Sequence, residues 1–84
     1  SMKLLYFAWV RQQIGIDEEY VSPPKEVNCV TSLITWLRTR GPRYVKAFED
    51  VSAIRVAINY ELVDFDAKLN GDEEVALFPP VTGG

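Results

Sequence analysis

The chain has 84 residues, 48% of them hydrophobic, and a formal net charge of −3 from 12 acidic and 9 basic side chains. This length and composition fit one small globular domain, and they exclude a disordered or fibrous chain. A weakly acidic domain is a poor candidate for binding the phosphate backbone of a nucleic acid, which requires concentrated positive charge. We therefore expect no nucleic acid among its partners.

The chain contains no histidine and a single cysteine, Cys29. Histidine is the commonest general base and the commonest metal ligand, and a zinc site built from thiolates needs several cysteines. These counts argue against a self-sufficient hydrolase, a metal site and a disulfide scaffold, and they favour a reducing, cytoplasmic setting. No apolar segment approaches the length of about 20 residues that a membrane helix needs, so we expect no membrane association.

The first predicted element is a strand over residues 3–10, a short run rich in aromatic and aliphatic side chains. Ser1 ahead of it is interpreted as a remnant of cloning. Both alternating faces of this strand are apolar, which implies cover on both sides of the sheet. A domain this small has one core, so a partner is expected to supply part of the second cover.

A second strand is predicted over residues 18–22, at hairpin spacing from the first. Residues 11–17 are expected to form the connector, around Gly15. Two prolines at positions 23 and 24 end the strand, because proline cannot donate to a sheet ladder.

The strongest helix signal covers residues 28–40. Its apolar side chains recur at the spacing of one helical face: Val30, Leu33, Ile34 and Leu37. Either Asn28 or Cys29 is predicted to be the N-cap. Gly41 is predicted to take the C′ position, with Pro42 preventing continuation of the helix.

The second half of the chain reads as a short helical turn and three strands. The predicted bounds are 42–48 for the turn, and 53–59, 62–63 and 74–78 for the strands, with a tight turn at 70–72. The resulting order of strands and helices is typical of an α+β fold. The economical solution is a mixed sheet with one main helix packed on one face, which is the β-grasp or ubiquitin-like fold. We treat residues 1–84 as one such domain.

The last six residues differ from an ordinary chain end. Pro79 and Pro80 follow the predicted strand directly, and paired prolines favour a stiff, extended backbone. Six extended residues reach about 20 Å. Gly83 and Gly84 have no side chains, so a narrow channel in a partner can hold their backbone closely. The pattern predicts a tail that presents its terminal carboxylate inside a partner.

The segment GDEEVALFPPVTGG, residues 71–84, resembles the C-terminus of the sulfur-carrier small subunits of molybdopterin synthase, relatives of the thiamine sulfur carrier and ubiquitin. YFAWVR at 6–11, the helix over 28–40 and VAIN at 56–59 resemble the same family in the same order, so the resemblance covers nearly the whole chain. A terminal Gly-Gly alone is a weak signal, whereas FPPVTGG is strong. Two acidic residues at 73–74, where the family usually has one, are interpreted as a one-residue insertion without functional consequence.

The resemblance implies a function for the terminal carboxylate. An E1-like adenylating enzyme would use ATP to activate Gly84, and a sulfur donor system would convert the adenylate into a thiocarboxylate. The large subunit of molybdopterin synthase would receive the tail, from Pro79 and Pro80 through Val81, Thr82 and Gly83, and transfer the sulfur to cyclic pyranopterin monophosphate. The chain would bind no cofactor and would not be an enzyme on its own, because the partner supplies the acid–base groups.

Four side chains match partner-facing positions of that family: Phe78, Phe7, Arg11 and Leu62. Phe78 matches the aromatic that anchors the root of the tail. A buried core role for Phe7 and Leu62 is an equal alternative, because strand alternation does not say which face of the sheet carries the helix.

The remaining side chains considered are expected to have no role in the chemistry. Trp36 is expected to be partly buried, and Cys29 to be inert. The arginines near the helix end, Arg38, Arg40 and Arg43, and the acids at positions 64, 66 and 72–74 are expected to be solvated.

Alternative functions stay open at this point. A sulfur carrier for thiamine synthesis or tRNA thiolation would also end in Gly-Gly, but not in FPPVTGG. A ubiquitin-like modifier, joined to lysines by an isopeptide bond, would use the same activated carboxylate. A β-grasp adaptor without terminal chemistry is a more distant alternative.

Overall fold

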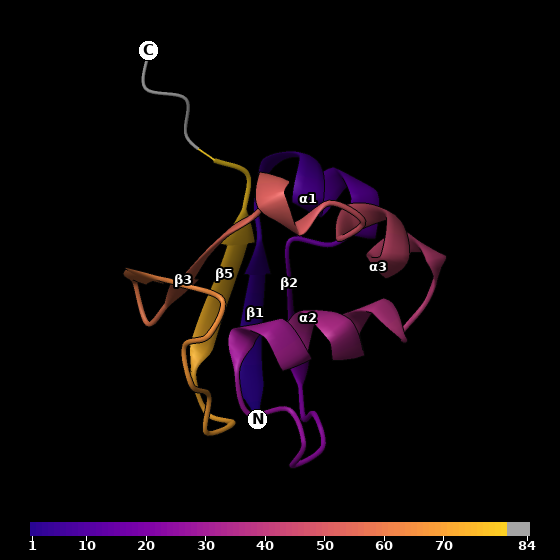
Figure 1. The fold of residues 1–84 in the computed structure, drawn as a ribbon. Helices are drawn as coiled ribbons and strands as arrows, with labels where there is room; N and C mark the ends of the chain where they lie inside the picture. Colours follow the sequence, from indigo (N-terminus) through magenta and orange to yellow (C-terminus); the bar gives the residue numbers. More distant parts are fainter. Residues whose placement is uncertain (81–84) are drawn as a thin grey trace.

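Five strands and three α-helices build the part of the chain that this computed structural model describes, residues 1–80. They are β1 (Met2–Tyr6), α1 (Ala8–Ile14), β2 (Glu18–Val21), α2 (Val30–Arg38), α3 (Pro42–Ala47), the 3-10 helix η1 (Val51–Ala53), β3 (Arg55–Ile58), β4 (Glu61–Val63) and β5 (Glu74–Phe78). The predicted α+β, β-grasp architecture is confirmed, with α2 as the main helix (Figure 1). None of the helices in this part of the chain is long and apolar enough to span a membrane.

The strands form one mixed sheet in the order β2-β1-β5-β3-β4. β1 and β5 are parallel and pair from Lys3 with Glu74 to Tyr6 with Leu77, and the other three pairs are antiparallel. The last strand therefore lies in the middle of the sheet. Because β1 and β5 run in the same direction, β5 ends beside Phe7, where α1 begins (Figure 1).

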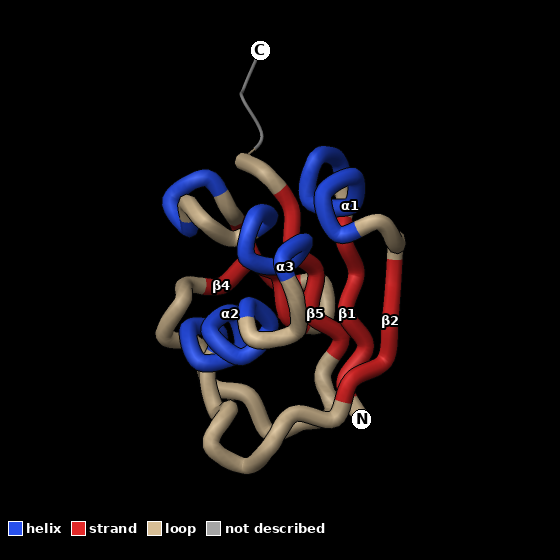
Figure 2. The backbone as a smooth tube through the Cα atoms, turned by 90° about the vertical axis from the view of Figure 1, so that its right-hand side faces the viewer, coloured by secondary structure: helices blue, strands red, loops and turns tan. Residues whose placement is uncertain are grey.

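One face of the sheet packs against the helices and forms the core. On β1 and β5 every second side chain is buried: Met2, Leu4, Tyr6, Val75 and Leu77. The apolar face predicted for α2 is confirmed, since Val30, Leu33, Ile34 and Leu37 are all buried. Figure 2 shows α2 and α3 on one side of β5, β1 and β2. Burial of each such side chain contributes about 1.5–3 kcal/mol.

The prediction of a strand through residue 10 was wrong. β1 ends at Tyr6, Ala8 turns the chain with a φ of 54°, and α1 follows where a connector was expected. Val10 and Ile14, four residues apart, are buried against the core, which is the helical spacing. A short apolar run fits a strand and a buried helix equally well, so its periodicity alone did not show the break. The antiparallel pairing of β1 with β2 is confirmed, although a helix and not a hairpin turn connects them.

Two element boundaries in the middle of the chain also differ from prediction. Cys29 is the N-cap of α2, as one alternative held, but the helix ends at Arg38 with Thr39 as its C-cap. Gly41, with a φ of 144°, is instead the N-cap of α3, and its carbonyl accepts the N–H groups of Tyr44 and Val45 at 3.1 Å. Glycine suits this position because its φ lies in the region that other residues avoid.

The strand predicted over residues 53–59 begins two residues late, at Arg55. Asp50 causes the delay, because its side chain accepts the N–H of Ser52 at 3.1 Å and caps a single turn of 3-10 helix. The short helix α3 and the strands β4 and β5 lie where the sequence predicted them.

A polar cluster around Glu19 joins β1, β2 and α3. The Tyr6 hydroxyl donates to Glu19 Oε2 at 2.7 Å, the Tyr44 hydroxyl donates to the same oxygen at 2.8 Å, and Arg40 Nη1 donates to Oε1 at 3.1 Å. Arg40 also lies over the rings of Trp36 and Tyr44, at 5.3 and 5.2 Å. Arg40 is thus exposed, as expected, but its guanidinium is also bound by Glu19 and the two rings, and Trp36 is partly buried as expected.

We expect the chain to lose stability at alkaline pH through Tyr6. Burial first, and then the hydrogen bond to Glu19, raises the pKa of Tyr6 above its ordinary value of 10.0, so the folded chain keeps the phenol neutral where the unfolded chain ionises it. The contribution of Tyr6 to the free energy of unfolding is therefore fully present below pH 10.0. Above that pH it falls by up to about 1.4 kcal/mol per pH unit.

Denaturant unfolding across this pH range measures the effect. Tyr6→Phe should lower the free energy of unfolding by about 1 kcal/mol at neutral pH, because Glu19 loses a hydrogen-bond donor. On going to alkaline pH, this variant should lose less stability than the wild type. Tyr20→Phe, at an exposed tyrosine, should keep the wild-type alkaline loss. An alkaline loss of the same size in Tyr6→Phe and the wild type would contradict the prediction.

Candidate functional site

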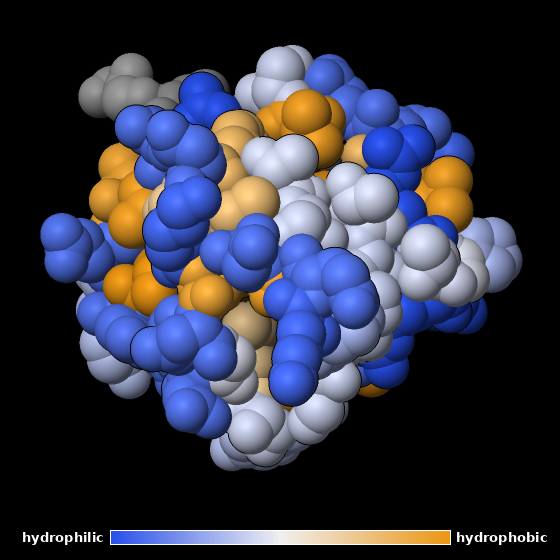
Figure 3. Space-filling view, turned by 60° about the horizontal axis from the view of Figure 1, so that its bottom comes forward, coloured by the Kyte–Doolittle hydropathy of each residue, from blue (hydrophilic) through white to orange (hydrophobic). Residues whose placement is uncertain are grey.

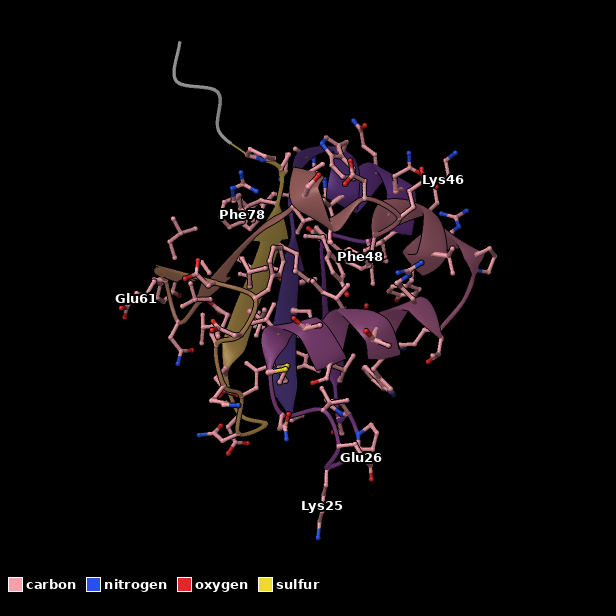
Figure 4. All side chains as sticks on the ribbon, viewed as in Figure 1. Lys25, Glu26, Lys46, Phe48, Glu61 and Phe78 are labelled. Atoms are coloured by element: carbon pink, nitrogen blue, oxygen red, sulfur yellow. The ribbon has the colours of Figure 1, made fainter. Side chains whose placement is uncertain are left out.

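The root of the tail lies at the end of the central strand. Phe78 is the last residue of β5 and is half-buried, paired with Arg55 of β3. Figure 4 shows Phe78 at the end of β5, on the side of the sheet away from Phe48, which lies among the helices. Pro79 and Pro80 continue the chain and are also half-buried. The predicted tail residues Val81, Thr82, Gly83 and Gly84 lie outside the described residues.

Phe7 lies beside Phe78. Its N–H donates to the Leu77 carbonyl at 3.2 Å, so the parallel register continues one residue past β1 and sets the two phenylalanines level with each other. Strand alternation points both away from the core, because their neighbours Tyr6 and Leu77 are buried. The Phe7 side chain is 46% exposed.

Leu62 lies on the same face of the sheet. The register runs from Leu62 to Ala57, then to Ala76 and to Leu5, so these side chains form one row across β4, β3, β5 and β1. Leu62 is 66% exposed. We call this side of the sheet, opposite the helices, the outer face; its apolar members are Leu5, Phe7, Ala57, Leu62, Ala76 and Phe78. The structure thus brings three of the four predicted contact residues onto one exposed face, and the core alternative for Phe7 and Leu62 is wrong.

Arg11 is exposed on α1 and does not belong to that row. Its backbone N–H donates to the carbonyl of Phe7, at the tail root, at 3.4 Å, while Arg11 also lines a surface hollow with Asp17 and Glu18. Sequence reasoning missed a second arginine there, Arg55, which pairs with Phe78 and whose guanidinium donates to the carbonyls of Ser52 and Ile54. Its position between buried Ile54 and Val56 was the available signal. Neither Arg11 nor Arg55 forms an ion pair within residues 1–80.

Away from the tail root, the outer face carries charged side chains around Lys3. Lys3 lies 3.8 Å from a carboxylate oxygen of Glu18 and 4.0 Å from one of Glu74, and its ammonium lies 6.0 Å from the ring centre of Tyr20. Exposed pairs of this kind contribute little to stability. Figure 3, which brings the end opposite the tail forward, shows hydrophobic patches broken up by hydrophilic side chains. The apolar part of the outer face is therefore confined to the half near the tail root and to the β3–β4 side.

The extra acidic residue before β5 has a structural role. The Glu73 carboxylate accepts the N–H of Asn70 at 2.7 Å and of Gly71 at 2.9 Å, and its own carbonyl accepts the N–H of Lys3 at 3.0 Å. Burial acts to raise the pKa of Glu73, but the turn's backbone N–H groups outweigh it and hold the pKa below its ordinary value of 4.5. Glu73 thus closes the turn that sets the start of β5, while the expectation that it has no functional consequence stays a prediction.

The cysteine at the start of α2 is bound into the helix cap. The Sγ atom of Cys29 lies 3.4 Å from the Ser32 hydroxyl, which also accepts the N–H of Cys29 at 3.1 Å. The Ser32 hydroxyl, and then its backbone N–H, lowers the pKa of the thiol below its ordinary value of 9.0. Among residues 1–80 no three Asp, Glu or Cys side chains gather closely enough to hold a metal ion.

Comparison with known proteins shows what the chain resembles. The model of the ThiS family matches residues 4–84. The molybdopterin synthase sulfur carrier subunit of Escherichia coli (strain K12) is 39% identical over 83 residues, which cover 99% of each chain. This similarity includes the tail.

Solved structures of similar proteins have the same fold. A putative molybdopterin converting factor subunit 1 from Pyrococcus furiosus superposes with a TM-score of 0.76 at 32% identity, over 95% of this chain and 97% of that one. The complex of subunits 1 and 2 of the molybdopterin-converting factor from Helicobacter pylori 26695 contains a chain with the same fold, with a TM-score of 0.65 at 20% identity, covering 99% of this chain and 97% of that one. The curated proteins that the chain resembles over its whole length are sulfur carrier subunits of molybdopterin synthase. Because the family model matches nearly every residue, the chain, with its exposed apolar face beside the root of a Gly-Gly tail, belongs to the ThiS family.

Proposed function

We propose that this protein carries sulfur on Gly84 as the small subunit of a molybdopterin synthase. The observation that carries the proposal is the sequence FPPVTGG, which begins with the last residue of the central strand, Phe78, at the tail root beside Phe7. The whole-length similarity to sulfur carrier subunits supports it. A chain without histidine is suited to this role, because a carrier contributes an acyl group and leaves proton transfer to its partners.

The first step activates the Gly84 carboxylate. An oxygen of the carboxylate attacks the α-phosphorus of ATP on an E1-like adenylating enzyme, and pyrophosphate leaves. The product is an acyl-adenylate, in which AMP is a good leaving group. A bare carboxylate does not react with nucleophiles, so this step must precede sulfur transfer.

The second step exchanges oxygen for sulfur. A sulfur donor system delivers sulfur at the oxidation level of sulfide, which attacks the carbonyl carbon of Gly84, and the C–O bond to AMP breaks with its electron pair leaving on AMP. The resulting thiocarboxylate is a better nucleophile than a carboxylate, because sulfur is larger and more polarizable than oxygen.

The third step takes place on the large subunit. The thiocarboxylate sulfur attacks an oxygen-bearing carbon of cyclic pyranopterin monophosphate, and the C–O bond at that carbon breaks, with its electron pair leaving on an oxygen that the large subunit protonates. Water then adds to the Gly84 carbonyl carbon and breaks its bond to sulfur. The carboxylate is restored and can be activated again. Two such deliveries supply the two sulfur atoms of the dithiolene.

The apolar half of the outer face is the proposed docking surface for both partners. Phe7, Leu62 and Phe78 are exposed or half-exposed beside the tail root, and a compact apolar patch with aromatic side chains is typical of interface hot spots. Since one surface serves the adenylating enzyme and the large subunit, the two compete, and the carrier must leave one to reach the other.

Intact mass spectrometry tests the sulfur chemistry. After incubation with its adenylating enzyme, ATP and a sulfur donor, the chain should gain the mass difference between sulfur and oxygen, located on Gly84. Adding the large subunit and cyclic pyranopterin monophosphate should return the original mass and yield molybdopterin. A chain that gains sulfur on Gly84 but yields no molybdopterin, and instead supports thiazole synthesis, tRNA thiolation or lysine adducts, would contradict the proposal and favour that alternative.

Removal of Gly84 separates chemistry from folding. The shortened chain ends at Gly83, which moves the carboxylate back by about 3.5 Å. Sulfur transfer should be lost, whereas the melting temperature should stay unchanged because the buried core side chains lie between Met2 and Leu77. A large drop in melting temperature would contradict this reading and give the tail a structural role.

Phe78→Ala tests the docking surface. The substitution should raise the Kd for the large subunit and for the adenylating enzyme by about tenfold or more, the effect of removing an interface anchor. Val51→Ala, at a 43% exposed side chain on η1, is the control and should change neither Kd. Wild-type affinity of Phe78→Ala for both partners would refute the anchor role.

A further inference from the structure

The loop between β3 and β4 contains only Asn59 and Tyr60, enclosed by the paired residues Ile58 and Glu61. Both loop residues have positive φ, 49° and 72°. Two-residue hairpin loops of this kind prefer Asn followed by Gly, because bulky side chains fit poorly at positive φ. Asn59 suits its position, but Tyr60 occupies the position where glycine is favoured.

Asn59 also explains why the loop keeps this shape. Its N–H donates to the Glu74 carbonyl at 2.8 Å, and its Oδ1 accepts the N–H of Glu74 at 3.0 Å. These two bonds tie the hairpin to the start of β5. The backbone at Tyr60 therefore stays at positive φ whatever side chain is there.

Within residues 1–80, the Tyr60 side chain gains neither substantial burial nor a hydrogen bond. Its side chain is 90% exposed, more than any other large hydrophobic side chain in residues 1–80, and its hydroxyl makes no hydrogen bond within them. Tyr20, also exposed, differs in that it lies in a regular strand and is contacted by Lys3. Glycine would suit the backbone better and tyrosine gains no burial, so the fold itself does not account for a tyrosine at this position.

Tyr60 lies at the end of the β3–β4 margin, two residues before Leu62 in the sequence. Along β3 and β4 the register runs from Arg55, opposite Phe78, to Ala57, opposite Leu62, and then to the loop. The hairpin lies at the free margin of the sheet, where Figure 4 shows Glu61 projecting outward. Exposed apolar side chains thus continue from the tail root down this margin.

We propose that Tyr60 is an anchor for the large synthase subunit, whose interface runs from the tail root along the β3–β4 margin to the hairpin loop. The inference rests on the proposed function. A stable subunit interface buries about 800 Å² on each partner, and an aromatic side chain supplies about 150–250 Å². Phe7, Leu62 and Phe78 are already partly buried and do not reach that area. Tyrosine is among the residues that most often dominate such interfaces.

The occupant is the large subunit and not the adenylating enzyme, because the two complexes need different contact areas. A stable complex between subunits needs the extended footprint, whereas a transient encounter that only has to deliver the tail can be smaller. Across the sheet at the same level, the Lys3, Glu18 and Glu74 cluster is charged, so the apolar footprint follows the hairpin side.

The test compares Tyr60→Gly with the wild-type chain by calorimetric titration against the large subunit, alongside thermal unfolding of each free chain. We expect the Kd to rise about tenfold or more while the melting temperature stays the same or rises by a few degrees, about 4 °C if the strain is fully relieved. Tyr60→Phe keeps the ring and should keep most of the affinity. Tyr20→Ala, at a matched exposed tyrosine on the opposite sheet margin, should change the Kd by less than about twofold.

Four results would overturn the inference. Equal affinity of Tyr60→Gly and wild type would remove Tyr60 from the interface while leaving the proposed function intact. A marked loss of melting temperature in Tyr60→Gly would make the residue structural. Normal affinity for the large subunit, combined with slower thiocarboxylate formation, would move the contact to the adenylating enzyme. No binding by the wild-type chain itself would overturn the proposed function, and the inference with it.

Discussion

The parallel pairing of β1 with β5 is the constraint on which the rest of the molecule depends. Parallel neighbours cannot be joined by a tight turn, so all the chain between Tyr6 and Glu74 must cross from one end of the sheet to the other. That connection supplies the helices that cover the core face and the β3–β4 hairpin that borders β5 on its other side. The chain end consequently emerges from the middle of a rigid sheet, beside Phe7.

The two faces of the sheet serve different purposes. The core face is closed by α1, α2 and α3, and the Glu19 cluster joins β1, β2 and α3, with both Glu19 carboxylate oxygens accepting hydrogen bonds. The outer face keeps apolar side chains exposed near the tail root, which a monomeric fold alone does not require. Residues at positive φ border the outer face at both ends of its apolar stripe, Ala8 after Phe7 and Tyr60 at the hairpin loop.

Much of the fold was predictable because its signals are local. The helical spacing of α2 and the prolines and turn residues that separate the later elements marked most of the order along the chain. The errors fell where a local pattern is ambiguous. The run from residue 3 to residue 10 reads as one strand, but Val10 packs in the core only because α1 turns it there. Gly41 reads as a helix end, but it opens α3, because Thr39 already closes α2.

The sequence by itself determined the pattern on which the proposed chemistry rests: two prolines ahead of Gly-Gly, in a chain without histidine, are visible without any folding. Only the tertiary structure decided which exposed apolar side chains lie together. Phe7, Leu62 and Phe78 are separated by long stretches of sequence, and alternation does not say which side of a strand is covered. The register of β1, β5, β3 and β4 places them on one face, and the helices exclude them from the other. Tyr60 is an ordinary turn residue in the sequence, and only its positive φ and its exposure distinguish it.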